Sequence, residues 1–186
     1  GQRKFVRTSN GVLHCVYESL GTVWYETSTD NGTTWAIRNG HEPLSSTDAK
    51  SPSITVVDDD QVLIVFQEKD ENYLRLRIIN YNVVWDEIWD NEIISSYGRD
   101  NTYSSFDAQP VIYYSYASAS YLNFIVLWRE GIQGGSFSPG FYYKYGTLFS
   151  DGGKLLNNVN IETQYNFLSG TNHNSISPSI AGIQNF

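Results

Sequence analysis

The sequence predicts an all-β protein in which a unit of four antiparallel strands is repeated about three times. Three observations support this prediction: strand-like segments recur with the same ending, two landmarks recur at one spacing, and a turn motif returns in eroded copies. The composition agrees with it. Aromatic side chains, which favour the half-buried surface of a sheet, make up 15% of the chain.

The most regular feature is a run of β-branched and aromatic residues that ends in a glutamate. It occurs at residues 12–18 (VLHCVYE), 62–68 (VLIVFQE) and 123–130 (NFIVLWRE). Each run has the composition of a buried strand that reaches an exposed rim. A shorter extended segment precedes each run, at residues 3–8, 51–57 and 108–114, and a fourth copy of it lies at residues 177–183.

Two further strands are predicted in each unit. The third strand covers residues 21–27, 73–79 and 140–146, and the fourth covers residues 36–38, 88–94 and 159–163. In the second unit, apolar Leu74, Leu76 and Ile78 alternate with Arg75 and Arg77. This period of two is typical of a strand with one buried face.

Constant spacing favours a repeat. Glu18 and Glu68 are 50 residues apart, and so are Trp35 and Trp85, whereas Glu68 and Glu130 are 62 residues apart. Four antiparallel strands in units of this length are the pattern of β-propeller blades. A β-sandwich is the alternative, but it does not explain the constant spacing. We expect blades at residues 3–48, 49–106 and 107–172, and the opening strand of a further blade at residues 177–186.

A turn motif lies between the third and fourth strands of the first unit. Residues 28–35 read STDNGTTW, in which the recurring pattern is S-x-D-x-G-x-x-W. We expect Asp30 and Ser28 to hydrogen-bond within the turn and Gly32 to adopt a positive φ. Trp35 is expected to be largely buried beneath the hairpin.

Eroded copies of the motif follow in the other two units. In the second unit Asn80, Asn82 and Trp85 replace the Asp, Gly and Trp, and Asn tolerates positive φ better than most residues. In the third unit the same places are taken by Asp151, Gly153 and Leu156.

The motif and its repetition resemble the Asp-box (BNR, sialidase-like) repeats of β-propellers. That group includes sialidases, related glycoside hydrolases, and sorting-receptor and assembly-factor propellers. The resemblance covers essentially the whole chain and implies that Asp boxes are structural elements of the outer rim, remote from any catalytic centre. A propeller is a closed ring. The resemblance therefore implies either a fragment of a longer propeller or two copies that close one six-bladed ring.

Candidate catalytic residues are few. A sialidase-like site would need three arginines that grip a substrate carboxylate, but no Arg recurs at equivalent places in the units and no Arg-Ile-Pro sequence is present. Glu18, Glu68 and Glu130 are the candidates for the paired carboxylates of a glycoside hydrolase. The simpler interpretation is that a residue repeated in every blade serves the fold, and we favour it.

Metal and nucleophile patterns are weak. His14, His41 and His173 are scattered singly, so neither a zinc-binding spacing nor a Ser-His-Asp order is visible. The run of Asp58, Asp59 and Asp60 could bind Ca²⁺, although a solvated hairpin loop explains it more simply. We therefore expect no cofactor, with calcium as the alternative. Cys15, the single cysteine, is expected to act as a small apolar residue.

Charge narrows the range of partners. The chain has 12 basic and 20 acidic residues and a net charge of −8, which disfavours nucleic acid and anionic membranes. We expect a non-catalytic propeller module that binds a glycan or a protein outside the cell, in the periplasm or at the cell surface. A fragment of a sialidase-like glycoside hydrolase and a scaffold or assembly-factor propeller are the alternatives.

Overall fold

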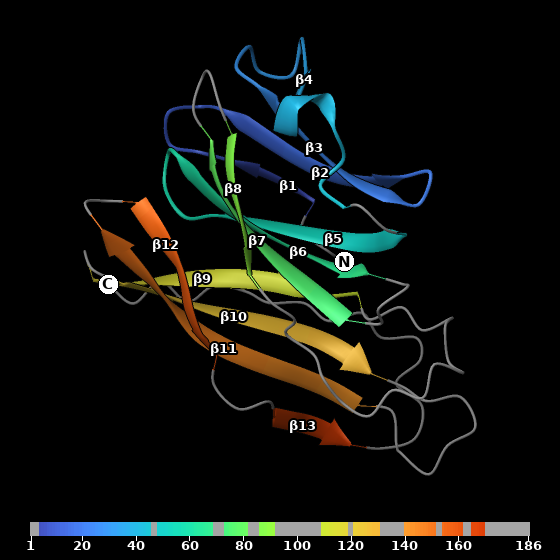
Figure 1. Cartoon of the computed structure of the whole chain (residues 1–186), viewed down its shortest axis with the longest axis vertical. Helices are drawn as coiled ribbons and strands as arrows, with labels where there is room; N and C mark the ends of the chain where they lie inside the picture. Colours follow the sequence, from blue (N-terminus) through green and yellow to red (C-terminus); the bar gives the residue numbers. More distant parts are fainter. Residues whose placement is uncertain are drawn as a thin grey trace.

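The protein is built from antiparallel β-sheets (Figure 1). The computed structural model describes residues 4–45, 48–68, 73–81, 86–91, 109–118, 121–130, 140–151, 154–161 and 165–169. In these ranges the helical structure is limited to one 3-10 turn, η1 (Asn39–His41). The predicted all-β class is confirmed.

Within the described residues, three sheets follow one another along the chain. The first has the order β1 (Phe5–Arg7), β2 (Leu13–Ser19), β3 (Thr22–Ser28) and β4 (Ala36–Ile37). The second has the order β5 (Ala49–Val56), β6 (Gln61–Glu68), β7 (Tyr73–Tyr81) and β8 (Asp86–Asn91). The third contains β9 (Val111–Ser118), β10 (Tyr121–Glu130), β11 (Gly140–Asp151), β12 (Lys154–Ile161) and β13 (Tyr165–Ser169). In each sheet the strands that are consecutive in the chain from the first to the fourth are neighbours.

The third sheet departs from the expected four strands. Its fourth strand, β12, begins at Lys154 rather than near residue 159, and β13 is an additional strand. β12 pairs with the second half of β11, where Gly146 lies opposite Ile161. β13 pairs with the first half, where Tyr143 lies opposite Tyr165. Because β11 is 12 residues long and β12 only 8, β13 covers backbone donors and acceptors that β12 leaves at this edge.

The second sheet lies between the other two (Figure 1). β5 contacts β1, β2 and β3 of the first sheet on one side and β9 of the third sheet on the other. β12 of the third sheet contacts β7 and β8. The sheets are therefore stacked in the order in which the chain forms them.

Two hydrophobic cores fill the spaces between the sheets. Alternate residues of β6 enter different cores: Val62, Ile64 and Phe66 face the first sheet, whereas Leu63 and Val65 face the third. The first core also contains Val16, Val23, Tyr25, Leu44, Ala49, Ile54, Ile79 and Tyr81. The second core also contains Val57, Leu74, Leu76, Ile78, Ile112, Phe124, Val126 and Trp128. Every residue of β6 is buried, which explains the continuous apolar run of residues 62–66 within it.

The sequence repeat is displaced by one residue from the repeat in the fold. Val16 in β2 and Phe66 in β6 are 50 residues apart, yet both lie in the core between the first and second sheets. If the fold repeated in step with the sequence, Val16 would face the core between the first and second sheets, and Phe66 would face the core between the second and third. A shift of one residue moves a side chain to the opposite face of a strand. The spacing therefore locates the strands correctly but not the faces of their residues.

We predict that the second core carries much of the stability of the protein. Leu76 is fully buried there, and Leu76→Ala should reduce the free energy of unfolding by about 2–5 kcal/mol, because it leaves a cavity. Leu20 is fully exposed, and the same substitution there should change it by less than about 0.5 kcal/mol. Urea unfolding measures both. Equal midpoints for the two variants would contradict the description of this core.

Candidate functional site

Polar residues gather at one rim between the first and second sheets. β2 ends near Glu18, β6 ends at Glu68, and β5 begins at Ala49, which lies opposite Glu68 in the sheet. The amide of Ala49 donates to the Gly21 carbonyl across 2.6 Å, so the start of β5 is held against the turn that follows β2. We define the rim by Glu18, Asp48, Glu68 and Arg75.

The two-residue turn between β2 and β3 fixes the shape of this rim. Leu20 and Gly21 have φ values of 52° and 80°, as a tight hairpin of this type requires. Glycine is favoured at position 21 by its φ of 80°, and a Cβ there would come within 2.8 Å of Asp48 Oδ1, which would have to shift. The connection to β5 is also held to β3, because Ser45 Oγ accepts a hydrogen bond from the Val23 amide at 3.0 Å.

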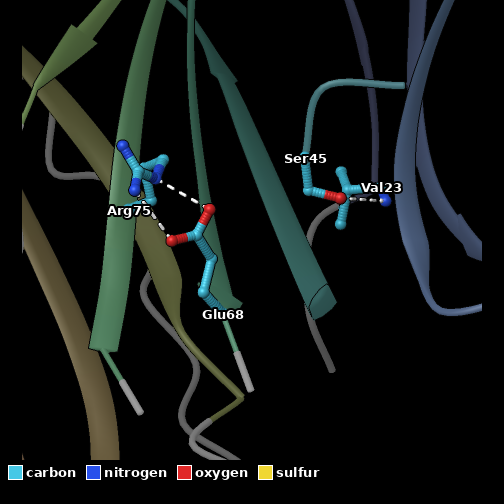
Figure 2. A network of polar contacts seen from close by, with 4 residues as sticks. All are labelled: Val23, Ser45, Glu68 and Arg75. Atoms are coloured by element: carbon cyan, nitrogen blue, oxygen red, sulfur yellow. Dashed lines mark hydrogen bonds and ion pairs between the residues drawn. The ribbon is translucent and has the colours of Figure 1, made fainter. Parts of the chain in front are cut away.

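Glu68 forms a two-pronged ion pair with Arg75 (Figure 2). Arg75 Nε lies 2.8 Å from Glu68 Oε1, and a terminal guanidinium nitrogen lies 2.8 Å from Oε2. The two residues are diagonal neighbours on β6 and β7, because Glu68 pairs with Tyr73. The Glu68 side chain is 2% exposed and that of Arg75 is 24% exposed. Bidentate pairing of this kind combines charge with fixed geometry.

Glu18 lies in a different environment. Its side chain is exposed, and Oε2 accepts a hydrogen bond from the Ser51 amide of β5 at 3.3 Å. Ser51 precedes Pro52 and has a φ of 57° at an irregularity of β5, a conformation that residues with side chains adopt rarely. The Glu18 carboxylate therefore anchors an unusual backbone position and remains accessible from the rim.

The three repeated glutamates have no common role in the described residues. Glu18 is exposed and bonds to the next sheet, whereas Glu68 is buried and bonds within its own sheet. Glu130 is the last residue of β10 and lies opposite Gly140, and its side chain lies outside the described part. Both oxygens of Glu68 are held by one cation, so this carboxylate cannot act as a nucleophile or proton donor without breaking the pair.

The turn at residues 28–35 is held together by Asp30. Asp30 Oδ1 accepts hydrogen bonds from the Thr34 amide at 2.9 Å and from the Ser28 hydroxyl at 2.8 Å, and Oδ2 accepts from the Thr34 hydroxyl at 2.6 Å. These bonds, that of the Thr34 hydroxyl above all, lower the pKa of Asp30 to about 2. Ser28 Oγ accepts from the Gly32 amide at 2.8 Å, and Gly32 has a φ of 88°. The Asp30 carboxylate acts within its own turn.

The expected burial of Trp35 is wrong. Its side chain is 38% exposed, because it lies against the turn rather than in a core between sheets. Its indole Nε1 donates to the Gly32 carbonyl at 3.1 Å, and its ring meets the edge of Phe5 with ring centres 6.0 Å apart.

The eroded copies of the motif differ from the first. Asn80 lies within strand β7 rather than in a turn; it is buried and accepts a hydrogen bond from Gln61 Nε2 at 2.6 Å. The reason is length: β7 continues to Tyr81 and pairs again at Asp86, so the connection is shorter than that between β3 and β4. Asp151 is the last residue of β11. Asn82, Trp85 and Gly153 lie outside the described residues, as does the strand expected at 177–186.

Among the aspartates at residues 58–60, Asp59 forms a latch between the first two sheets. Asp59 accepts hydrogen bonds from Ser9 Oγ at 2.7 Å and from the Asn10 amide at 3.1 Å, which lower its pKa. The Tyr81 hydroxyl donates to the Asp59 carbonyl. Asp58 accepts from the Asp60 amide at 2.8 Å. The described residues contain no group of three or more His, Cys, Asp or Glu side chains that could hold a metal ion.

His14 is a buried polar residue that the sequence patterns do not reveal. His14 is fully buried, its Nδ1 lies 2.7 Å from the Tyr25 hydroxyl, and its ring meets the edge of Tyr81 at 4.4 Å. Its position two residues before Val16 on the inward face of β2 is the only signal in the sequence. His41 is exposed in η1, and His173 lies outside the described part.

No family model matches the chain, and neither the curated proteins nor the solved structures contain a match. Within the described residues, no helix has the length and apolar character needed to cross a membrane.

We predict that Asp30 contributes to stability only while it is ionised. Its pKa of about 2 lies below the usual value near 3.8, so its contribution is complete above that value and is lost as the pH falls toward 2. Asp30→Asn should therefore lower the melting temperature at neutral pH, and the difference from wild type should shrink below about pH 4. A difference that is constant across this range would contradict the role of the ionised carboxylate.

Proposed function

We propose that this chain is part of an Asp-box β-propeller that binds glycans without catalysis, at the rim between the first and second sheets. The fold part of the proposal is supported by three stacked antiparallel sheets with consecutive strand order, and by the turn built around Asp30. The net charge of −8 disfavours nucleic acid and anionic membranes as partners. The proposal includes a place outside the cell, in the periplasm or at the cell surface.

The state of Glu68 carries the proposal that the rim binds rather than cleaves. Glycoside hydrolysis uses two carboxyl groups, one of which donates or accepts a proton while the other acts as a base or nucleophile. Glu68 is 2% exposed and both of its oxygens are held by Arg75. Of the other two carboxylates of the rim, Glu18 is exposed and its Oε2 accepts a hydrogen bond from the Ser51 amide, whereas Asp48 is half-buried beside Gly21. The paired state of Glu68 therefore supports binding rather than cleavage.

The polarity of the rim favours a glycan over a protein. Its charged groups include the exposed Glu18 carboxylate and the partly exposed Asp48 carboxylate and Arg75 guanidinium, whose donors and acceptors suit sugar hydroxyls. Protein interfaces rely on clusters of aromatic and apolar side chains. Among the described residues, Phe5, Leu20 and Trp35 are the large exposed apolar ones, and of these only Leu20 belongs to the rim turn.

A glycan array and a fluorogenic sialoside assay test the proposal together. We expect the purified chain to bind glycans on the array and to leave the sialoside uncleaved. Glu18→Gln removes the accessible charge while keeping the shape, and it should weaken glycan binding by about tenfold or more, since hydrogen bonds to charged groups contribute about 1.5–3 kcal/mol.

Asp60→Asn is the matched control. Asp60 is an exposed carboxylate at the opposite end of β6, and its replacement should leave glycan binding unchanged. Turnover of the sialoside that is lost in Glu18→Gln would instead favour the glycoside hydrolase. Failure to bind any glycan, with capture of a protein ligand, would favour a scaffold or assembly role.

A further inference from the structure

His14 places a titratable ring in the core between the first and second sheets. It is fully buried on the inward face of β2, two residues before Val16 of the same core. Its strand partners are Val6 on β1 and Thr27 on β3. In the sequence repeat the equivalent place, 50 residues further along, is taken by Ile64, which also lies in this core. An apolar side chain thus serves the packing in the second unit, whereas the first unit carries a group that can bind a proton.

The ring of His14 contacts side chains of both sheets. Within the first sheet, its Nδ1 lies 2.7 Å from the Tyr25 hydroxyl. Across the core, the ring meets the edge of Tyr81 on β7, with ring centres 4.4 Å apart. Tyr81 in turn donates from its hydroxyl to the Asp59 carbonyl and from its amide to the Asp60 carbonyl. His14 therefore lies at the latch end of the contact between the two sheets, where Asp59 joins them.

The strands packed around His14 contribute apolar and tyrosine side chains to this core. β1 contributes Val6, β5 contributes Ile54 and Val56, and β6 contributes Val62. The charged groups that these elements direct toward the core lie at its two ends. Among the described residues they are Lys4, Asp59 and Asp60 at the latch end, and Glu18, Asp48, Glu68, Arg75 and Arg77 toward the rim. A proton on His14 would therefore place a positive charge among apolar and aromatic groups.

Protonation of this histidine has a different free energy in the closed and in the open contact. Burial disfavours the charged imidazolium, whereas a histidine in water binds a proton with a pKa of about 6.5. Above that pH the ring is neutral in both states, so the pH does not affect the contact. Below it, the open contact binds a proton that the closed contact excludes. The equilibrium constant for opening should then rise by up to about tenfold for each pH unit.

We propose that a fall in pH loosens the contact between the first and second sheets through protonation of His14. The inference goes beyond the proposed function and does not rest on glycan binding. It bears on the rim, because the Ala49 amide bonds to the Gly21 carbonyl and the Ser51 amide to Glu18 across the same contact. Opening of the contact would break the bonds that give the rim its shape.

Amide hydrogen exchange of the wild-type chain, followed by NMR, is the first test. Protection is compared at about pH 7.5 and 5.5, on either side of the usual histidine pKa, after correction for the intrinsic effect of pH on exchange. The Ala49 amide, which bridges the first two sheets, should lose about tenfold of its protection at the lower pH. The Val126 amide, in the central strand β10 of the third sheet, should keep its protection.

Two results of this comparison overturn the proposal. Unchanged protection at Ala49 would mean that the contact is insensitive to pH. An equal loss at Ala49 and Val126 would mean that the chain unfolds as a whole rather than at the contact between the first two sheets.

His14→Gln tests whether His14 is the group that titrates. Glutamine carries no charge and can still hydrogen-bond to the Tyr25 hydroxyl, so the protection of Ala49 should become the same at both pH values. His14→Phe is the second variant, used where the glutamine variant does not fold, because it keeps an uncharged ring against Tyr81.

His41→Gln is the matched control. His41 is an exposed histidine in η1, and its replacement should leave the tenfold loss at Ala49 as it is in wild type. A loss that persists in His14→Gln or His14→Phe, or that disappears in His41→Gln, overturns the assignment of the switch to His14.

Discussion

The burial of the second sheet on both faces is the constraint on which the rest of the structure depends. An antiparallel sheet usually leaves one face to water, and its strands then alternate apolar and polar residues. All eight residues of β6 are buried, so both faces of this strand are covered. Most buried polar groups in proteins are paired within the protein. Gln61 bonds to Asn80 at one end of β6, and Glu68 bonds to Arg75 at the other.

The same constraint produces both the latch and the rim. Where the buried sheet ends, its turns meet those of the first sheet, and polar contacts replace the apolar core. At one end Asp59 holds Ser9 and the Asn10 amide; at the other, Glu18 holds the Ser51 amide. These contacts fix the stacking of the two sheets at both ends of their common core. The proposed binding rim is therefore a consequence of the packing, because charged residues lie where the buried strands end.

Strand positions could be predicted from the sequence because their signals are local. The alternation of Leu74, Leu76 and Ile78 with Arg75 and Arg77 is enough to indicate β7 and its buried side. The turn around Asp30 is also local, since its bonds lie within seven residues. The face on which each residue of a strand lies, the short β7–β8 connection and β13 depend on contacts between segments that are distant in the sequence. The sequence near Trp35 does not show whether its ring is buried or lies exposed against a turn. The sequence near Asn80 does not show whether its amide lies in a strand or in a turn.

The repeated glutamates show why a shared position in a sequence repeat does not establish a shared role. Glu18 and Glu68 follow the same apolar run at the same spacing, yet one is accessible and the other is 2% exposed. The difference arises from the residues across from them. Glu68 has Arg75 as a diagonal neighbour, whereas the corresponding neighbour of Glu18 on β3 is Tyr25, which cannot form an ion pair. A carboxylate without a cation in its own sheet must reach the backbone of the next sheet or solvent, and Glu18 does both. Chemistry at the rim therefore depends on the third strand more than on the repeated glutamate itself.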